Sequence, residues 1–339
     1  MDKASEQAKP VFIVGMNGSG TTMLLDNLGR HPELYAFPRE TRLIPYLIST
    51  HARFGDLDDD ENFRRLWEEV LGMNVFEYVN DHSHVPLPED WKHYPRNLAG
   101  VLDGVFRYFA ARENKQRWCE KTPQHVQHMD KLAVLFPLAR FIHVIRDGRD
   151  SAASFNRRWY RTPELTLFRW KKVVSAGHRQ GEAMGPQRYM EVRYEDLTTH
   201  PELWLKKICE FIEVPYDEAV LVSAQPYLKT APSSEEQVEG AGRLKPNSGN
   251  WKKYFSKSKK RRLERIGGRT LALFGYETTS ADSDFDPPAW KRRLWTVKDY
   301  ITQYGREIGL KMTGKIERPW RVILSRPFTA SKQRGENQY

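Results

Sequence analysis

The glycine-rich stretch between Gly15 and Thr22 has the residue types and spacing of an anion-binding loop. Backbone N–H groups converge in such a loop, and the dipole of a following helix favours negative charge. Gly15 and Gly20 match the two glycines of a nucleotide P-loop, and Thr22 matches its hydroxyl position. Thr21 stands where that loop has its lysine, so a γ-phosphate would lack its usual counter-charge. The stretch predicts a site for a phosphate-like group rather than for a triphosphate with magnesium, with a ligand-free glycine turn as the alternative.

A second candidate anion site follows an apolar run at residues 140–145. Arg146 comes directly after this run, and Ser154 lies on the helix that is expected next. An arginine at a strand tip and a nearby serine hydroxyl can together hold a phosphate. The alternative is a charged turn that is simply solvated.

Two further charged residues are predicted at strand ends. Glu40 follows a short apolar run at residues 34–37, and Lys121 ends the run at residues 117–121. In doubly wound sheets, ligands bind at the carboxyl ends of the strands, so Glu40 is expected to face the glycine loop. A helix N-terminal acid, stabilised by the helix dipole, is the alternative interpretation of Glu40.

Strands and helices alternate along the part of the chain that carries these residues. The run Val11–Val14 is apolar without a break, which is typical of a strand buried on both faces. Further strands are predicted at residues 34–37, 117–121, 140–145 and 188–194, and helices at residues 62–71, 97–113, 165–183, 201–212 and 256–274. A helix opening at Thr21 follows the glycine loop.

Other segments are predicted to be additions to this core. Residues 51–95 are interpreted as an insertion, and residues 225–250, rich in Pro, Ser, Gly and Glu, as a mobile loop. Residues 277–288 are polar and acidic like a linker, and a basic tail with a helix at residues 290–312 follows. We therefore expect one domain over residues 1–276 and an appendage over residues 277–339.

The composition limits the class of protein. The 339 residues include 54 Lys and Arg against 44 Asp and Glu, a formal net charge of +10, which suits an anionic partner. The sequence carries no nucleic-acid-binding motif, and Cys119 and Cys209 are too few for a disulfide framework or a metal cluster. No apolar run approaches a membrane span, and the polar first residues lack the core of a signal peptide, so a cytoplasmic protein is expected.

Six motifs in a fixed order resemble the sulfotransferases that use 3′-phosphoadenosine-5′-phosphosulfate (PAPS). They are VGMNGSGTTML, PRETRLIP, CEKTP, VIRDGRDSAAS, VRYEDL and LKPNSGNW, and the resemblance spans about residues 10–275. It is closest to the branch that contains the tyrosylprotein sulfotransferases and many bacterial enzymes. It implies an α/β fold with a P-loop-like parallel sheet, helices on both faces and a C-terminal helical extension.

The resemblance also implies roles for individual residues. The 5′-phosphosulfate would be held by the loop residues Asn17, Gly18, Ser19, Gly20, Thr21 and Thr22. Arg146 and Ser154 would hold the 3′-phosphate, and Tyr194 would form or support the nucleotide site. Glu40 would be the general base, with Lys121 on the substrate side and Lys245 reaching back over the cofactor.

The implied reaction is in-line transfer of a sulfuryl group from PAPS, as co-substrate, to an acceptor hydroxyl or amine, without a metal. The family usually has Arg or Lys where this chain has Gly18, and losing one such contact to developing charge can lower a rate by ~10²–10³. A P-loop-like nucleotide kinase and a catalytically weakened PAPS-binding protein remain as alternatives. A glycan, lipid, small molecule or peptide tyrosine is a possible acceptor, and the basic C-terminal region predicts contact with a membrane surface or a polyanion.

Histidines are the rival general bases. The candidates are His31, His125, His128 and His143. His125 lies nearest to Lys121 in the sequence and is therefore the strongest rival, whereas the position of His143 inside a strand favours a structural role.

Overall fold

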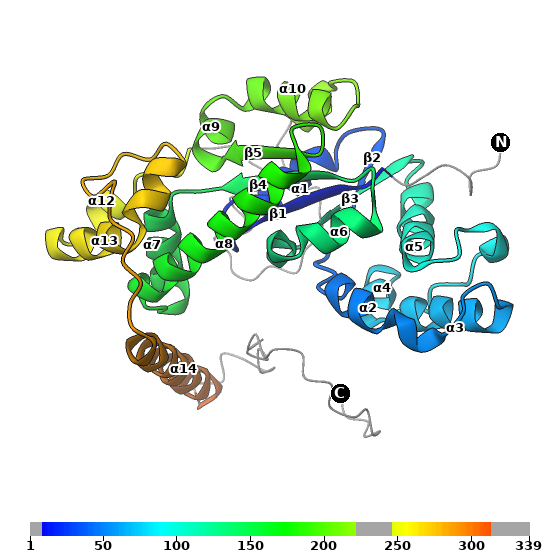
Figure 1. The fold of residues 1–339 in the computed structure, drawn as a ribbon, viewed down its shortest axis with the longest axis horizontal. Helices are drawn as coiled ribbons and strands as arrows, with labels where there is room; N and C mark the ends of the chain where they lie inside the picture. Colours follow the sequence, from blue (N-terminus) through cyan, green and yellow to red (C-terminus); the bar gives the residue numbers. More distant parts are fainter. Residues whose placement is uncertain (1–8, 222–245, 313–339) are drawn as a thin grey trace.

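A five-stranded parallel sheet forms the centre of the protein, in the strand order β2-β3-β1-β4-β5 (Figure 1). The structure is a computed structural model, and it describes residues 9–221 and 246–312. The strands are β1 (Val11–Gly15), β2 (Leu34–Ala36), β3 (Arg117–Lys121), β4 (Arg140–Ile145) and β5 (Tyr189–Arg193). The predicted strands are thus confirmed, with small differences at their ends.

Strand β1 lies in the middle of the sheet and is buried along its whole length. It pairs with β3 on one side, in the register Val11 to Cys119, and with β4 on the other, in the register Gly15 to Val144. Side chains on both faces of β1 therefore pack into apolar cores, as its unbroken apolar sequence predicts.

Helices cover both faces of the sheet, which confirms the predicted α/β architecture (Figure 1). Apolar residues of α1, α9 and α10 pack on one face, and those of α5 and α6 pack on the other. The helices are α1 (Thr21–Leu28), α2 (Ile44–Thr50), α3 (Asp60–Leu71), α4 (Asn74–Val79), α5 (Leu98–Arg112), α6 (Met129–Leu135), α7 (Gly148–Trp159), α8 (Pro163–Met184), α9 (Tyr194–Thr199), α10 (Pro201–Phe211), α12 (Trp251–Tyr254), α13 (Lys257–Leu273) and α14 (Ala289–Met312).

The region predicted as an insertion, residues 51–95, packs through aromatic side chains. Trp67 and Phe76 are fully buried in the core beneath α5, and Phe76 meets Phe106 of α5 edge to face at 5.8 Å. The helices of this region thereby extend one apolar core beyond the edge of the sheet.

Residues 277–288 lie along α13 and α8. The backbone N–H of Arg269 donates to the carbonyl of Ser283 at 2.9 Å, and the Lys171 ammonium of α8 forms ion pairs with Asp284 and Asp286. The helix α14 follows this segment, and it lies near the N-terminal end of α8 (Figure 1). Within residues 9–221 and 246–312, no helix is both long enough and apolar enough to span a bilayer.

Candidate functional site

The candidate site lies where the sheet changes its winding direction. From β1 the chain moves to β2 at one edge of the sheet, whereas from β4 it moves to β5 at the other edge. The carboxyl ends of β1 and β4 are therefore neighbours with diverging connections, which is where open α/β sheets bind ligands. The glycine loop follows β1 at this point, and Arg146 follows β4.

The glycine loop leads straight into an open helix N-terminus. Gly18 and Gly20 have φ values of +82° and +99°, which favour glycine, and the Ser19 N–H donates to the Met16 carbonyl at 3.0 Å. No side chain caps α1, so the N–H groups of its first turn are available to an anion. Thr21 opens the helix from a buried position.

Arg146 joins the tip of β4 to this loop. Its guanidinium donates from Nη1 to the Gly18 carbonyl at 3.2 Å and from Nη2 to the Asn247 carbonyl at 2.5 Å. The guanidinium also lies over the ring of Tyr194, 4.4 Å from its centroid. These contacts hold a positive charge beside the loop in one orientation.

A cavity of about 290 Å³ opens next to Arg146. Its lining residues come from the β4 tip, α7 and the segment before α13: Arg146, Asp150, Ala153, Ser154, Arg157, Asn247, Asn250, Lys253 and Tyr254. Arg146 and Ser154 therefore share one cavity, which is the pairing that the sequence predicted. Three of the nine lining side chains are cationic, a composition that favours an anionic occupant.

The turn after β4 is packed into the protein, so the alternative of a solvated charged turn is wrong. Asp147 accepts hydrogen bonds from the Arg149 guanidinium, which also pairs with Glu264 of α13 at 2.8 Å. The indole N–H of Trp170 donates to the Arg146 carbonyl at 2.9 Å. These contacts fix the backbone that carries Arg146.

Asp150 ties the segment before α12 to this turn, a role that the sequence did not reveal. Its carboxylate accepts the N–H of Gly249 at 2.6 Å and the N–H of Trp251 at 2.9 Å. The Trp251 ring lies under the Arg149 guanidinium at 3.9 Å. Burial raises the pKa of Asp150, and the two backbone N–H groups oppose that rise. This arrangement places Asn247 over the cavity.

Glu40 and Lys121 form an ion pair across two neighbouring strand ends. Glu40 Oε1 accepts from Lys121 Nζ at 2.9 Å, and Glu40 Oε2 accepts from Arg42 Nε at 2.8 Å. Burial raises the pKa of Glu40, but the charges of Lys121 and Arg42 outweigh burial and hold the pKa below its usual value. Glu40 is therefore ionised at neutral pH. Because Lys121 pairs with Ile13 across the sheet, this ion pair lies beside β1, just before the glycine loop.

Glu120 positions the segment that carries Glu40. Its carboxylate is fully buried and accepts the N–H of Thr41 at 3.2 Å and the hydroxyl of Thr41 at 3.1 Å. Thr122 and His125 bond to the same carboxylate, His125 through Nδ1 at 3.1 Å. Glu120 alternates with Lys121 along β3, so the two side chains point to opposite sides of the strand.

Three of the four rival histidines are buried and bonded to protein groups. His31 bonds to the Pro215 carbonyl at 2.7 Å, His125 to Glu120, and His143 to the Tyr189 hydroxyl at 2.6 Å. Burial, followed by the neighbouring His178, lowers the pKa of His143 to about 3, so its ring is neutral at ordinary pH. Because these three rings are buried, none of them is placed to take a proton from an acceptor substrate.

The described structure brings most of the predicted site residues together at one sheet edge. Arg146 touches both the loop and Tyr194, Ser154 shares its cavity, and the Glu40–Lys121 pair lies at the neighbouring strand end. Lys245 lies outside the described residues. The sequence reasoning missed Asp150 and Glu120, although Asp150 stands inside the quoted VIRDGRDSAAS motif and Glu120 inside CEKTP.

Two buried polar atoms suggest what this site could hold. Within the described part of the chain, Ser19 Oγ and Arg146 Nε have no hydrogen-bond partner. Arg146 lines the cationic cavity and Ser19 belongs to the glycine loop, so an anionic ligand that reaches both would supply the missing partners. A nucleotide with anionic groups at both ends matches the open N-terminus of α1 and the Arg146 cavity. Among the described residues, no group of three or more His, Cys, Asp or Glu could hold a metal ion.

Comparison with known proteins is consistent with this arrangement. A model of the sulfotransferase family matches residues 10–218. The curated relatives include a protein-tyrosine sulfotransferase of Drosophila melanogaster, 28% identical over 62% of this chain and 39% of the relative. Another, protein-tyrosine sulfotransferase 1 of Danio rerio, is 26% identical over 62% of this chain and 55% of the relative. The chain thus spans about half the length of these relatives or less.

Solved structures share the fold at lower sequence identity. The sulfotransferase domain of the Synechococcus PCC 7002 olefin synthase has a TM-score of 0.54 at 22% identity, over 81% of this chain and 98% of that domain. The sulfotransferase domain from the curacin biosynthetic pathway has a TM-score of 0.56 at 19% identity, over 80% of this chain and 99% of that domain. The family match covers more than half of the chain, and the chain therefore belongs to the sulfotransferase family.

Proposed function

We propose that this protein transfers a sulfuryl group from PAPS to an acceptor hydroxyl or amine. The observation that carries the proposal is the contact between Arg146 and the Gly18 carbonyl, at 3.2 Å. This contact supports the proposal because it joins the glycine loop to the Arg146 cavity, the two places where we propose that anionic groups bind. PAPS carries a 5′-phosphosulfate and a 3′-phosphate, so it requires two such positions.

The chain would bind the nucleotide through both positions. The N–H groups at the start of α1, with Thr21 and Thr22, would bind the 5′-phosphosulfate, and Arg146 with Ser154 would bind the 3′-phosphate. Tyr194 would hold Arg146 in place through its ring. By the family resemblance, Lys245 would also reach the cofactor, although it lies outside the described residues.

The chemistry would be an in-line displacement. The acceptor oxygen or nitrogen forms a bond to sulfur while the bond from sulfur to the bridging oxygen breaks, and the electron pair of that bond stays on the departing 5′-phosphate. Glu40 would take the acceptor proton, since it is ionised and lies at the neighbouring strand end. Lys121 and the loop N–H groups would stabilise the growing negative charge.

The acceptor classes to be tested follow from the family of the relatives. The relatives are named protein-tyrosine sulfotransferases, so a peptide tyrosine stands beside glycan, lipid and small-molecule hydroxyls in an acceptor screen. The kinase alternative is not favoured, because Thr21 replaces the lysine that a γ-phosphate requires.

Calorimetric titration with adenosine 3′,5′-bisphosphate tests the nucleotide half. We expect the wild-type protein to bind, and Arg146→Ala to weaken binding by about tenfold or more, because a hydrogen bond to a charged group is worth about 1.5–3 kcal/mol. Arg179→Ala, which removes an exposed arginine of α8, should bind as the wild type does. Equal binding by Arg146→Ala would contradict the proposed site.

Labelled PAPS tests the transfer. We expect label to reach at least one acceptor of the screen, and Glu40→Gln to abolish transfer while leaving the affinity for adenosine 3′,5′-bisphosphate unchanged. Binding without transfer to any acceptor would support the alternative of a weakened PAPS-binding protein, and ATP hydrolysis in place of transfer would support the kinase.

A further inference from the structure

Six of the fifteen exposed large apolar side chains in the described residues lie on α14. Those on this helix are Trp290, Leu294, Val297, Tyr300, Ile301 and Tyr304. Trp290 is 67% exposed and Ile301 is 64% exposed. The spacing of Trp290, Leu294 and Ile301 places them along one face of the helix, in a stripe that continues through Val297 and Tyr304.

The opposite face of α14 attaches the helix to the protein. Asp299 is 1% exposed, and its carboxylate accepts the N–H of Thr162 at 2.9 Å and the Thr162 hydroxyl at 2.6 Å. Thr162 is the N-cap residue of α8, so the Asp299 carboxylate lies at a helix N-terminus, where negative charge is favoured. Gln303 donates to the Trp159 carbonyl at 3.2 Å. The apolar stripe therefore points directly away from the protein body.

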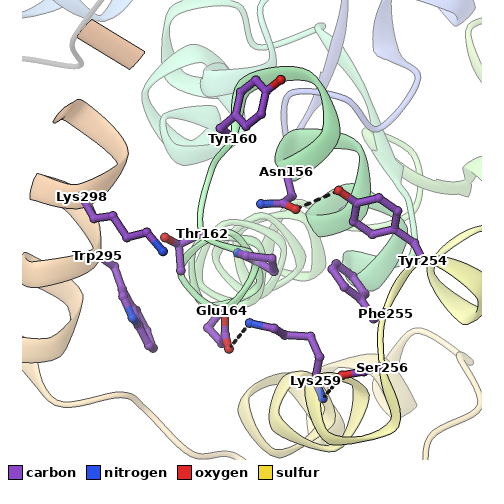
Figure 2. A pocket seen from close by; sticks show the side chains of 11 residues that line it. Asn156, Tyr160, Thr162, Glu164, Tyr254, Phe255, Ser256, Lys259, Trp295 and Lys298 are labelled. Atoms are coloured by element: carbon purple, nitrogen blue, oxygen red, sulfur yellow. Dashed lines mark hydrogen bonds and ion pairs between the residues drawn. The ribbon is translucent and has the colours of Figure 1, made fainter. Parts of the chain in front are cut away.

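Figure 2 shows this attached face across a cavity of about 470 Å³. Trp295 and Lys298 of α14 lie on one side, and Glu164, Lys259 and Ser256 lie on the other. The N-terminal part of α13 therefore faces α14. Arg262 of α13 also pairs with Glu164 at 3.3 Å, so basic side chains of α13 lie on the attached side of α14.

The basic side chains of α14 favour an anionic surface as the partner of the stripe. Over residues 289–306 the exposed charged side chains are all basic: Lys291, Arg293, Lys298 and Arg306. The acidic residue of this range, Asp299, is buried against Thr162. By the helical period, Lys291 borders the stripe on one edge and Arg293 borders it on the other, whereas the side chain of Lys298 lines the cavity. An apolar stripe with aromatic residues between basic edges has the pattern of a helix that lies in a lipid interface.

A second copy of the chain fits this stripe less well. The 4-3-4-3 spacing from Trp290 to Tyr304 could form the seam of a two-helix coiled coil. The flanking positions of that seam would hold Lys291, Arg293 and Lys298 in each copy. In either helix orientation these residues face basic partners, and like charges at flanking positions oppose pairing.

We propose that α14 is an interfacial anchor that docks the protein on an anionic lipid surface, with the stripe from Trp290 to Tyr304 buried in the headgroup region. The basic side chains that border the stripe, Lys291 and Arg293, would face the anionic headgroups. This proposal stands apart from sulfuryl transfer, because it rests on α14 and not on the glycine loop.

Vesicle co-sedimentation of the full chain tests it. We expect binding to phosphatidylcholine vesicles that contain phosphatidylserine, little binding to phosphatidylcholine alone, and weaker binding in high salt. The double variant Leu294→Ser/Ile301→Ser should lower partitioning by about tenfold or more, since each side chain buries apolar surface in the interface. Its Tm should match the wild type, because both side chains are exposed.

A matched control removes exposed leucines elsewhere. Leu203 of α10 and Leu273 of α13 are 52% and 57% exposed, and the variant Leu203→Ser/Leu273→Ser should bind vesicles as the wild type does. Absence of binding by the wild type, or full binding by the α14 variant, would overturn the proposal. A dimer in sedimentation velocity that the α14 variant dissociates, without vesicle binding, would assign the stripe to a second copy instead. Binding to heparin that persists in the α14 variant, without vesicle binding, would overturn it as well.

Discussion

The ring of Phe155 lies 3.0 Å from the position that a Cβ atom on Gly18 would occupy. Gly18 also has a φ of +82°, a conformation that favours glycine. Phe155, from α7, therefore fills the space where the related enzymes usually begin a basic side chain. An Arg at this position would therefore strain the backbone and press on the Phe155 ring.

A double-mutant cycle checks this relationship. We expect Gly18→Arg to lower the free energy of unfolding by about 1–3 kcal/mol, from backbone strain and from the contact with Phe155. Gly18→Arg should lower the free energy of unfolding by less when it is introduced into the Phe155→Ala variant than into the wild type. Urea denaturation of the four proteins measures this coupling. Gly249→Arg is the control, since Gly249 has a φ of +74° with nothing within 4 Å of its Cβ position. Additive effects of the two substitutions would contradict a steric coupling.

The acid limb of the pH–rate profile reports the environment of Glu40. The pKa of Glu40 lies below 4.5 because Lys121 and Arg42 outweigh the effect of burial, so kcat/KM should fall only below about pH 4.5. Arg42→Gln removes one positive charge, which raises the pKa of Glu40, so the acid limb should move to higher pH. Arg39→Gln is the control, because the Arg39 guanidinium lies over Tyr78 at 4.1 Å. An unmoved limb in Arg42→Gln would exclude Glu40 as the titrating base.

Asp150 should affect the affinity for the nucleotide indirectly, by positioning the segment that carries Asn247. Asn at this position keeps one acceptor oxygen for the two N–H groups of Gly249 and Trp251, so the segment that carries Asn247 loses one support. We expect Asp150→Asn to weaken binding of adenosine 3′,5′-bisphosphate several-fold and to increase hydrogen exchange over residues 246–251. The exposed Asp130 of α6 supplies the control, Asp130→Asn. Unchanged exchange in this segment would contradict the bracing role.

Glu120 should make stability depend on acid. Burial raises its pKa, but His125 and the hydrogen bonds to its carboxylate outweigh burial and leave the pKa below 4.5. Its stabilising contribution is therefore complete above about pH 4.5 and is lost as the pH falls through the folded-state pKa. Glu120→Gln should lower the free energy of unfolding at pH 7 by about 2–4 kcal/mol and flatten its acid dependence. If the free energy of unfolding of the variant fell as steeply in acid, a group other than Glu120 would cause the acid dependence.

Local patterns predicted the elements of the sheet and its loop. The unbroken apolar run at Val11–Val14 and the glycines after it are short-range signals, and both correspond to β1 and its loop. Arg146 and Glu40 were identified because each was expected near the carboxyl end of a strand, where α/β sheets bind ligands. The strand order also agrees with the P-loop-like sheet that the six motifs implied.

Contacts between distant segments were beyond sequence reasoning. Asp150 is one of several charges in its turn, and only the folded chain brings Gly249 and Trp251 to its carboxylate. Nothing in the sequence connects Phe155 with Gly18, yet the Phe155 ring lies 3.0 Å from the position of a Cβ atom on Gly18. Periodicity assigns faces within an element, but it does not say which distant side chain will meet each face.

The position of β1 in the middle of the sheet sets the order in which the protein can fold. Both strands that pair with β1 come much later in the chain, and β2 pairs with β3 rather than with β1. During synthesis the glycine loop therefore emerges long before any strand that can hold it in place. Such non-local pairing is slow to form and leaves apolar strands exposed in the meantime. A ligand that needs both the loop and Arg146 can bind only after β4 has joined β1, so its binding reports assembly of the central sheet.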